Sequence, residues 1–301
     1  MDVSEAQSAV LSLLRRVSPS ALPRVIQWMR SSSEIEELTC SNAEVLLHSI
    51  ADYLRDCLPV EAMVSSEKQA MENIQRIQKP TLHVDAFLYN DEIIDSLCEE
   101  GKLSRNYCMS CGSTKTAPLD FLSHSFSIPE LKFLFHHALP DLNGKTLLDV
   151  GSRLGAVLYA GYVYSSASKL EGVEINAEFC DLQEEVIKKY RFFDRLQVHH
   201  SDICSQKTLL HQADVVVLNN VFEYFLNKEE QMKAWIFMYE NLRNKGCLVV
   251  TVPSLKESFC KLQINIQLSQ WVEEIELDTD LFVGPDTDQE ALSDIHLYRV
   301  L

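Results

Sequence analysis

Two glycines and two carboxylates in the middle of the chain have the types and spacing of a site for a nucleoside-containing ligand. Asp149 lies in an apolar run, Gly151 and Gly155 follow it, and Glu174 ends the next apolar run. A glycine turn lets a ligand approach the backbone at the start of a helix, and a carboxylate at the tip of the following strand accepts hydrogen bonds from ribose hydroxyls. The sequence therefore predicts a nucleoside-cofactor site within residues 143–176.

The elements that must position these residues alternate between strand and helix from Thr146 onward. Apolar runs predict strands at 146–150, 169–174, 196–201, 214–219 and 247–252, with helices between them at 154–168, 177–190, 205–211 and 228–243. This alternation predicts a mostly parallel sheet that is covered on both faces. Beyond a helix near 255–268, the segments 271–278 and 294–301 follow one another without an intervening helix, which predicts an antiparallel pair at the end of the sheet.

The glycine turn and the order of the elements together resemble the class I S-adenosylmethionine-dependent methyltransferases. DVGSRLG at 149–155 and VEIN at 173–176 are similar to the first two cofactor motifs of that family, and IHLYRV at 295–300 is similar to its last strand. The resemblance implies an α/β, Rossmann-like, mostly parallel seven-stranded sheet with a C-terminal antiparallel hairpin, and S-adenosylmethionine as cofactor. The turn alone is also compatible with a dinucleotide; the terminal strands and Asp202 favour S-adenosylmethionine.

The resemblance also assigns residues to the parts of the cofactor. Those implied for its methionine end are Asp149, Gly151, Ser152, Arg153 and Gly155. Glu174 matches the acidic residue that binds both ribose hydroxyls, because a carboxylate can accept two hydrogen bonds at once. Ile175 and Ile203 are expected to form the two apolar walls of an adenine slot, and Asp202 to accept a hydrogen bond from the exocyclic amine. Without a ligand, Asp202 would simply cap a helix.

Arg153 departs from the pattern, because the family has glycine at this position. If the backbone there needs a positive φ, arginine costs about 1 kcal/mol or more. Two interpretations follow: either the guanidinium pairs with the carboxylate of the cofactor, or the pocket is degenerate.

The segment 219–225, NNVFEYF, follows the fourth predicted strand, where the family places its substrate-facing residues. Its two asparagines resemble the VNN segment of the non-SET histone lysine methyltransferases, whereas VFEYF resembles a turn of small-molecule methyltransferases. Methyl transfer from a sulfonium needs mainly proximity, orientation and a deprotonated nucleophile. Asn219, also expected at the cofactor, could orient an amine, Glu223 could attract or deprotonate it, and Tyr224 could contact an alkylammonium by a cation–π interaction. The alternative is a purely structural turn.

The rest of the chain predicts two further parts. Residues 1–80 have apolar side chains at helical spacing and are interpreted as an all-helical N-terminal module, which binds a protein partner or covers the cofactor domain. Residues 81–118 are interpreted as a linker, and residues 119–301 as the methyltransferase domain. The linker contains Cys108 and Cys111, half of a zinc knuckle; because no second C-x-x-C exists, no metal site is assigned.

Composition limits the class of protein. With 46% hydrophobic residues the chain can build a packed core, and its net charge of −17 disfavours a nucleic-acid partner. Nine scattered cysteines indicate reduced thiols, and we expect a protein of the cytoplasm or nucleus. No apolar run is long enough for a signal peptide or a membrane span. Residues 271–301 hold nine acidic residues against Arg299 alone. Such a run is usually a solvated face, but at the rim of a substrate site it would favour a basic protein or peptide as substrate.

These observations predict transfer of a methyl group from S-adenosylmethionine to an acceptor, with a protein side chain as the favoured acceptor. Two alternatives stay open. One is a catalytically inactive, methyltransferase-like binding or scaffold protein, which Arg153 and the mixed 219–225 segment favour. The other is a methyltransferase that acts on small molecules.

Overall fold

The computed structural model describes residues 3–31, 33–63, 67–68, 81–108, 116–118, 120–223, 225–279, 282 and 288–301. Tyr224 and Cys111 lie outside the described residues. The chain divides into two compact units, Met1–Leu46 and Leu47–Leu301.

The first unit is helical over its described residues, as the sequence predicts. It contains α1 (Val3–Leu14), α2 (Leu22–Ser31) and the beginning of α3 (Ser33–Cys57). The module was expected to extend to residue 80; most of residues 64–80 lies outside the described residues. On α1 and α2 several large apolar side chains are exposed, among them Leu11, Leu13 and Trp28.

The second unit begins inside α3, whereas the sequence placed a domain boundary near residue 80. The C-terminal half of α3 buries the side chains of Leu47, Ile50 and Leu54 completely. Its polar face bonds to α8 (Ala177–Tyr190), since Tyr53 donates to Glu185 at 3.1 Å and the hydroxyl of Tyr190 donates to the carbonyl of Ser49 at 2.9 Å. These contacts make the end of α3 part of the unit that holds the main sheet.

The predicted linker contains regular structure. β1 (Thr81–His83) pairs in parallel with β4 (Asp120–Leu122), and β2 (Asn106–Cys108) pairs antiparallel with β3 (Thr116–Pro118). Between β1 and β2 lies α5 (Asp91–Glu99), whose first turn is capped by the side chain of Asn90. Pairing of β1 with β4 fixes the segment around residue 83 beside the segment around residue 122.

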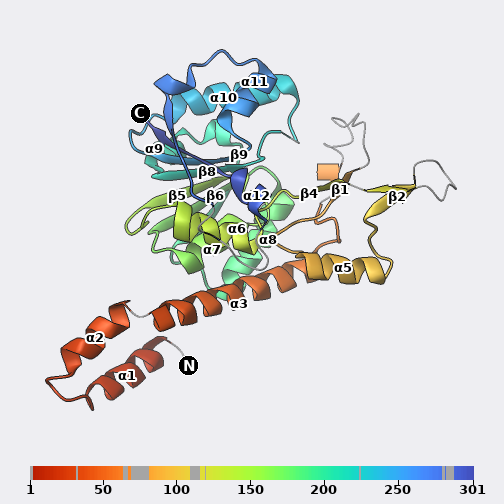
Figure 1. The fold of residues 1–301 in the computed structure, drawn as a ribbon. Helices are drawn as coiled ribbons and strands as arrows, with labels where there is room; N and C mark the ends of the chain where they lie inside the picture. The colour runs from red at the N-terminus through yellow and green to blue at the C-terminus, as the bar shows by residue number, and fades with distance from the viewer. Residues whose placement is uncertain are drawn as a thin grey trace. The chain divides into compact units, whose positions relative to one another are not determined.

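The main sheet has seven strands (Figure 1). They are β5 (Thr146–Val150), β6 (Lys169–Glu174), β7 (Leu196–His200), β8 (Val215–Asn219), β9 (Leu248–Val252), β10 (Val272–Ile275) and β11 (His296–Val300). Their order is β10-β11-β9-β8-β5-β6-β7, and β11 is antiparallel to both of its neighbours while the strands from β9 to β7 are parallel. This is a Rossmann-like, mostly parallel seven-stranded sheet with an antiparallel C-terminal pair, so the predicted fold class is confirmed.

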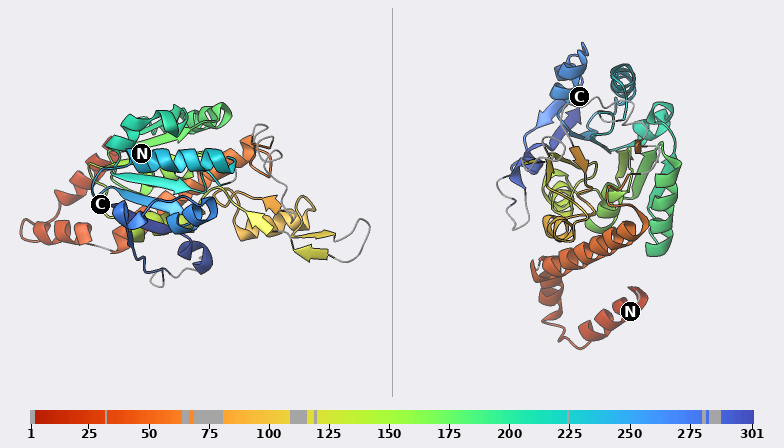
Figure 2. Two further views of the ribbon diagram at one scale, coloured as in Figure 1. Left: turned by 90° about the horizontal axis from the view of Figure 1, so that it is seen from above. Right: turned by 90° about the vertical axis from the view of Figure 1, so that its right-hand side faces the viewer.

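Helices cover both faces of this sheet, as the two views in Figure 2 show. The connecting helices are α6 (Ile128–Phe133), η1 (Leu134–Ala138), α7 (Ala156–Tyr164), α8, η2 (Ile203–Ser205), α9 (Lys207–Gln212), α10 (Lys228–Asn241) and α11 (Leu255–Leu262). Alternate strand residues point to opposite faces, so Leu148 and Val216 join the core formed with Trp235 of α10. Because both faces are buried, the inner strands carry mainly apolar side chains, with Asp149 of β5 and Glu171 of β6 among the exceptions.

The terminal strands form an antiparallel pair as predicted, but the connection between them is not a simple loop. It includes α12 (Gln289–Ser293), which begins where the carboxylate of Asp288 accepts from the backbone N–H groups of Glu290 and Ala291. The sequence analysis missed this helix because it is only about one turn long. A further short turn, η3 (Leu268–Gln270), precedes β10.

None of the helices in the described part of the chain combines the length and the apolar character that crossing a membrane requires.

Candidate functional site

The glycine turn after β5 lies at the carboxyl ends of the parallel strands. Gly151 has φ of 70° and Gly155 has φ of 83°, in the left-handed region that favours glycine. A Cβ atom at Gly151 would lie 2.4 Å from Cγ2 of Val221, and one at Gly155 would lie 2.6 Å from the hydroxyl oxygen of Tyr159. Both the backbone conformation and the close packing therefore require glycine, and the turn is packed directly against the segment that follows β8.

Glu174 ends β6 beside this turn, and its carboxylate is held by two backbone groups. The N–H of Arg153 donates to Oε2 and the N–H of Asn176 donates to Oε1, both at 2.8 Å. The side chain is buried, which raises its pKa. Each carboxylate oxygen can accept more than one hydrogen bond. The carboxylate is thus fixed in one orientation and keeps the capacity to accept from a pair of hydroxyls.

Asp149 is a second buried carboxyl group close to Glu174. Burial raises its pKa to about 8, and the neighbouring Glu174 carboxylate adds to this shift. Beside it, the hydroxyl oxygen of Ser152 is buried without a hydrogen-bond partner among the described residues. Asp149 and Glu174 are neighbouring carboxyl groups that are both buried. They favour a cationic ligand, because a positive charge would stabilise their ionised forms.

Arg153 has φ of 45°, so the backbone strain expected at this position is present. Its guanidinium group is buried and bonds entirely within the protein: Nε donates to Glu67 and Nη1 to Asp85, each at 2.8 Å, and Nη2 donates to the carbonyl of Ala62 at 2.5 Å. The ring of Phe179 lies 5.0 Å from the guanidinium carbon. The suggestion that this side chain pairs with a cofactor carboxylate does not describe the structure, because internal acids already neutralise the guanidinium.

The residues expected around an adenine ring occupy the ends of β6 and β7. Ile175 is 68% exposed, which is unusual for an isoleucine, whereas Ile203 is buried. Asp202 is exposed and its carboxylate accepts from the N–H of Cys204 at 2.8 Å, so it caps η2. The cap uses one carboxylate oxygen and leaves the other for a ligand.

The segment after β8 begins with two asparagines that bond to each other. Nδ2 of Asn220 donates to Oδ1 of Asn219 at 3.1 Å, and the backbone N–H of Asn220 donates to the carbonyl of Val252 at 2.7 Å. Asn220 has φ of 50°, a conformation that asparagine tolerates better than most residues. The side chain of Asn219 is half-buried at the end of β8. Two residues later in the chain comes Val221, which packs against Gly151 of the glycine turn.

The carboxylate of Glu223 bonds to its own turn and to α11. Its carboxylate accepts from Oγ of Ser258 on α11 and from the backbone N–H of Phe222, both at 3.1 Å. Burial raises its pKa. Phe222 is buried against Trp235 in the core and has no face open to a ligand. Tyr224 lies outside the described residues, and its predicted role stays a prediction.

Two histidines that the sequence did not indicate as site residues lie against the segment that follows β8. Nδ1 of His83 and Nε2 of His124 are 3.0 Å apart, and the two ring planes differ by 10°. The ring of His124 also lies 5.0 Å from the ring of Phe225, in the segment after β8. The two histidines are 41 residues apart and meet because β1 pairs with β4. No local sequence pattern could have indicated this contact.

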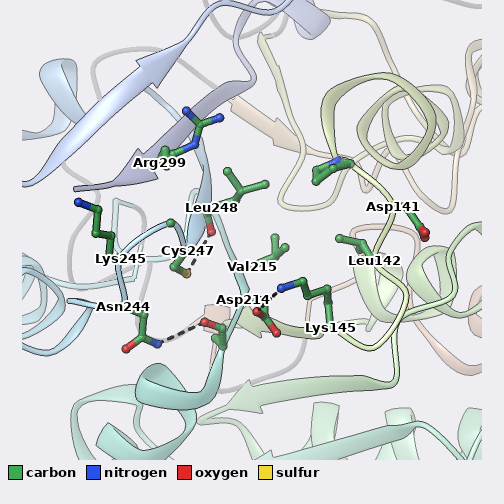
Figure 3. A pocket seen from close by; sticks show the side chains of 13 residues that line it. Asp141, Leu142, Lys145, Asp214, Val215, Asn244, Lys245, Cys247, Leu248 and Arg299 are labelled. Carbon is green, nitrogen blue, oxygen red and sulfur yellow. Dashed lines mark hydrogen bonds and ion pairs between the residues drawn. The ribbon is translucent and has the colours of Figure 1, made fainter.

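The cavity in Figure 3 lies at the amino ends of the parallel strands, opposite the glycine turn. Its volume is about 430 Å³ and its lining includes Val215 and Leu248, the first residues of β8 and β9. Lys145 points to Asp214 across it, 3.0 Å from the carboxylate. None of the residues predicted for the cofactor or the acceptor lines this cavity.

Among the described residues, no group of three or more histidine, cysteine, aspartate or glutamate side chains could hold a metal ion. Cys108 ends β2 and pairs with Thr116 on β3, while its expected partner Cys111 is not described.

No protein-family model matches the chain, and no curated protein matches it in sequence. Several solved structures are similar in fold. An RNA methyltransferase from Salinibacter ruber, in complex with S-adenosyl-L-homocysteine, has 17% identity and a TM-score of 0.38, with 58% of this chain and 91% of that chain covered. An O-methyltransferase from Bacillus cereus has 15% identity and a TM-score of 0.42, with 60% and 84% covered. A putative methyltransferase from Escherichia coli has 14% identity and a TM-score of 0.39, with 62% and 92% covered.

Proposed function

We propose that the chain is a methyltransferase that uses S-adenosylmethionine. The observation that carries the proposal is the carboxylate of Glu174, which two backbone N–H groups hold at the end of β6 beside the glycine turn. In a parallel α/β sheet, a carboxylate in this place binds the ribose of a nucleoside cofactor. The class I methyltransferase fold around it makes S-adenosylmethionine the cofactor of choice.

The residues at this edge suit the cofactor. When bound, S-adenosylmethionine supplies an electrophilic methyl group on a sulfonium. Glu174 would hold the ribose, and Ile175 with Ile203 would enclose the adenine. The buried carboxyl group of Asp149 would face the ammonium of the methionine part, where a positive charge offsets the cost of burying two carboxylates together. Arg153 takes no direct part; it holds Glu174 through its backbone N–H.

For the acceptor we propose a protein side chain in a basic peptide. Acidic residues gather around the beginning of α6, where the pKa of Glu130 is raised mainly by burial and further by Asp288 and Asp294. α12 contacts α6, and Phe282 packs against Phe133 at 5.6 Å, so the acidic C-terminal segment lies along this helix. Three carboxyl groups in one place would attract lysine and arginine side chains.

A non-catalytic binding protein is the second candidate, and Arg153 is the observation that favours it. The guanidinium fixes the glycine turn to Ala62, Glu67 and Asp85 through buried bonds. Because Glu67 and Asp85 already fix this turn through Arg153, the turn is ordered without a bound cofactor.

Isothermal calorimetry with S-adenosylmethionine separates the two candidates. We expect the wild-type chain to bind and Glu174→Ala to lose binding, because the ribose loses its acceptor. Glu178→Ala, at an exposed position in the first turn of α8, is the matched control and should bind as the wild type does. No binding to the wild type up to millimolar cofactor would exclude the enzyme.

The acceptor is tested with S-adenosylmethionine labelled in its methyl group. Transfer to basic peptides but not to a pool of metabolites supports a protein acceptor. Transfer to the metabolite pool alone would identify a small-molecule methyltransferase instead.

We further propose that the N-terminal module binds a protein partner and that the protein works in the cytoplasm or nucleus. Exposed Leu11, Leu13 and Trp28 support a docking role for the first two helices. Free thiols at Cys57, Cys98 and Cys260 support a reducing compartment.

A further inference from the structure

A shallow groove lies along one face of α2. It has a volume of about 290 Å³, and the residues that line it are Ala21, Arg24, Val25 and Trp28. Positions 21, 25 and 28 fall on one side of a helix, so three apolar side chains form a continuous face with an arginine beside it. The side chain of Trp28 is 50% exposed in this groove.

Exposed apolar side chains are concentrated in α1 and α2. Ten large hydrophobic side chains are exposed among the described residues, and five of them belong to these two helices: Val10, Leu11, Leu13, Ile26 and Trp28. Single exposed apolar residues are ordinary on a protein surface, whereas a group of them marks a contact site. The groove on α2 is therefore part of a larger apolar surface that a ligand can cover.

The charge of these helices is opposite to that of the chain as a whole. Residues 3–31 hold four arginines against Glu5 alone, although the net charge of the chain is −17. Arg15, Arg16 and Arg24 are exposed, and no ion pair joins any of them to another described residue. These guanidinium groups can therefore pair with carboxylates that a ligand brings.

We propose that α1 and α2 dock an acidic amphipathic helix of a protein partner. The apolar side chains of that helix would enter the groove beside Trp28, and its carboxylates would pair with the surrounding arginines, as when an amphipathic helix lies in a hydrophobic groove. The inference rests on the docking role proposed above for the first two helices, and it names the chemistry of the partner.

Charge favours this occupant over two others. A second copy of the chain would bring the same arginines against each other, and like charges repel. A membrane with anionic lipids would attract the arginines but repel the remainder of the chain, which holds the excess of acidic residues. A short acidic segment of a partner meets neither obstacle.

Trp28 itself reports the contact. The chain has three tryptophans, and the other two, Trp235 and Trp271, are buried in the core. The indole N–H signals of the ¹⁵N-labelled full chain, assigned with Trp28→Phe, therefore distinguish the groove from the core. The probe is a synthetic helical peptide with leucine on one face and glutamate on the other. We expect it to shift the Trp28 signal and to leave the other two in place.

Two further peptides of the same length test the chemistry of the partner by calorimetry. One has lysine in place of glutamate and the other has alanine in place of leucine, and both should bind at least about tenfold more weakly than the acidic peptide. Added salt should weaken the acidic peptide, because it screens exposed charges. Equal affinity for the lysine peptide would overturn the acidic partner and leave the docking role standing. Failure of all three peptides to bind would overturn both.

Variants of the full chain locate the contact. Trp28→Ala should weaken binding of the acidic peptide at least about tenfold, because tryptophan anchors dominate such contacts. Arg24→Glu should weaken it as well and should gain affinity for the lysine peptide, a reversal that loss of folding could not produce. Phe193→Ala and Lys233→Glu, at exposed positions in the second unit, are the matched controls and should bind as the wild type does. Unchanged binding in both groove variants would refute this site.

Other occupants of the groove would give different results. A Trp28 signal that moves with protein concentration in the absence of peptide would indicate a second copy. Tighter binding to vesicles that contain phosphatidylserine than to the acidic peptide would indicate a membrane. Fluorescence of Trp28 that acrylamide does not quench in the peptide-free chain would indicate that the chain covers its own groove. Each of these three results would overturn the acidic partner.

Discussion

The backbone N–H of Arg153 donates to Oε2 of Glu174 at 2.8 Å, so the residue that breaks the glycine pattern also orients the carboxylate on which the proposed cofactor site depends. The side chain of the same arginine turns the other way, to Glu67 and Asp85. One residue thus connects the end of β6 with a segment about 80 residues earlier.

Replacing Arg153 by methionine should destabilise the second unit strongly. Removal of one member of a buried ion pair leaves Glu67 and Asp85 as uncompensated buried charges, which typically costs about 3–5 kcal/mol. The free energy of unfolding, measured by urea titration, gives the result. Arg105→Met is the matched control, because its salt bridge to Asp95 is exposed and such pairs contribute roughly 0–1 kcal/mol. Equal losses in the two variants would contradict the structural role assigned to Arg153.

Replacing Ile175 by alanine should weaken cofactor binding without changing stability. The side chain is 68% exposed in the free protein, so its removal leaves no cavity and should change the free energy of unfolding by less than about 0.5 kcal/mol. If adenine covers it, affinity should fall about 10- to 150-fold, because burial of a large aliphatic side chain is worth about 1.5–3 kcal/mol and each 1.4 kcal/mol is a factor of about ten. Phe193→Ala, 70% exposed elsewhere on the surface, serves as control in the same calorimetric titration.

The buried carboxyl group of Asp149 should make stability depend on pH. Its pKa is about 8 in the folded state and about 3.9 in an unfolded chain. Between these values the folded state binds more protons than the unfolded state, so stability is highest at the acid end and decreases as the pH rises to 8. Asp149→Asn cannot ionise and should remove this decrease from the pH profile of urea unfolding. A wild-type and a variant profile that run parallel would contradict the shift.

Cofactor binding should lower the raised pKa of Asp149. A cation placed beside Asp149 favours its ionised form, so binding at pH 7 should release protons and affinity should rise with pH up to about 8. Calorimetric enthalpies measured in buffers of different ionisation heat report the proton release, which Asp149→Asn should abolish.

Replacing Gly155 by alanine should cost more than the same change at Gly246. Both glycines have left-handed φ, 83° and 86°, so each alanine bears a backbone strain of about 1–2 kcal/mol. Only at Gly155 does the new Cβ also meet the fully buried ring of Tyr159, at 2.6 Å, while the space at Gly246 is open. We expect a further loss of about 1–3 kcal/mol from this overpacking. Thermal denaturation of the two variants side by side measures the difference.

The sheet could be predicted from the sequence because short runs rich in apolar residues alternate with helix-length segments, and the bounds of β5 and β6 agree with the prediction. The glycine turn was predictable for the same local reason. The ion pairs of Arg153 and the contact of His83 with His124 were not, since they join residues 86, 68 and 41 positions apart. Those contacts depend on the tertiary positions of β1, β4 and the end of α3, and the local periodicity of the sequence carries no information about these positions.

Glu223 shows a further limit of sequence analysis. Its position after β8 indicates a substrate-facing acid, but the carboxylate accepts from Ser258 and from its neighbour's backbone. Whether a polar side chain serves a ligand or its own turn depends on the direction of one or two χ angles, which spacing does not determine.

The position of β11 has a consequence for synthesis on the ribosome. This strand, made last, lies in the interior of the sheet between β9 and β10 and bonds to both. Until residues 296–300 leave the exit tunnel, β9 presents an open edge and β10 has no partner. The nascent chain must therefore keep β9 and β10 from pairing with other chains until translation of β11 is complete.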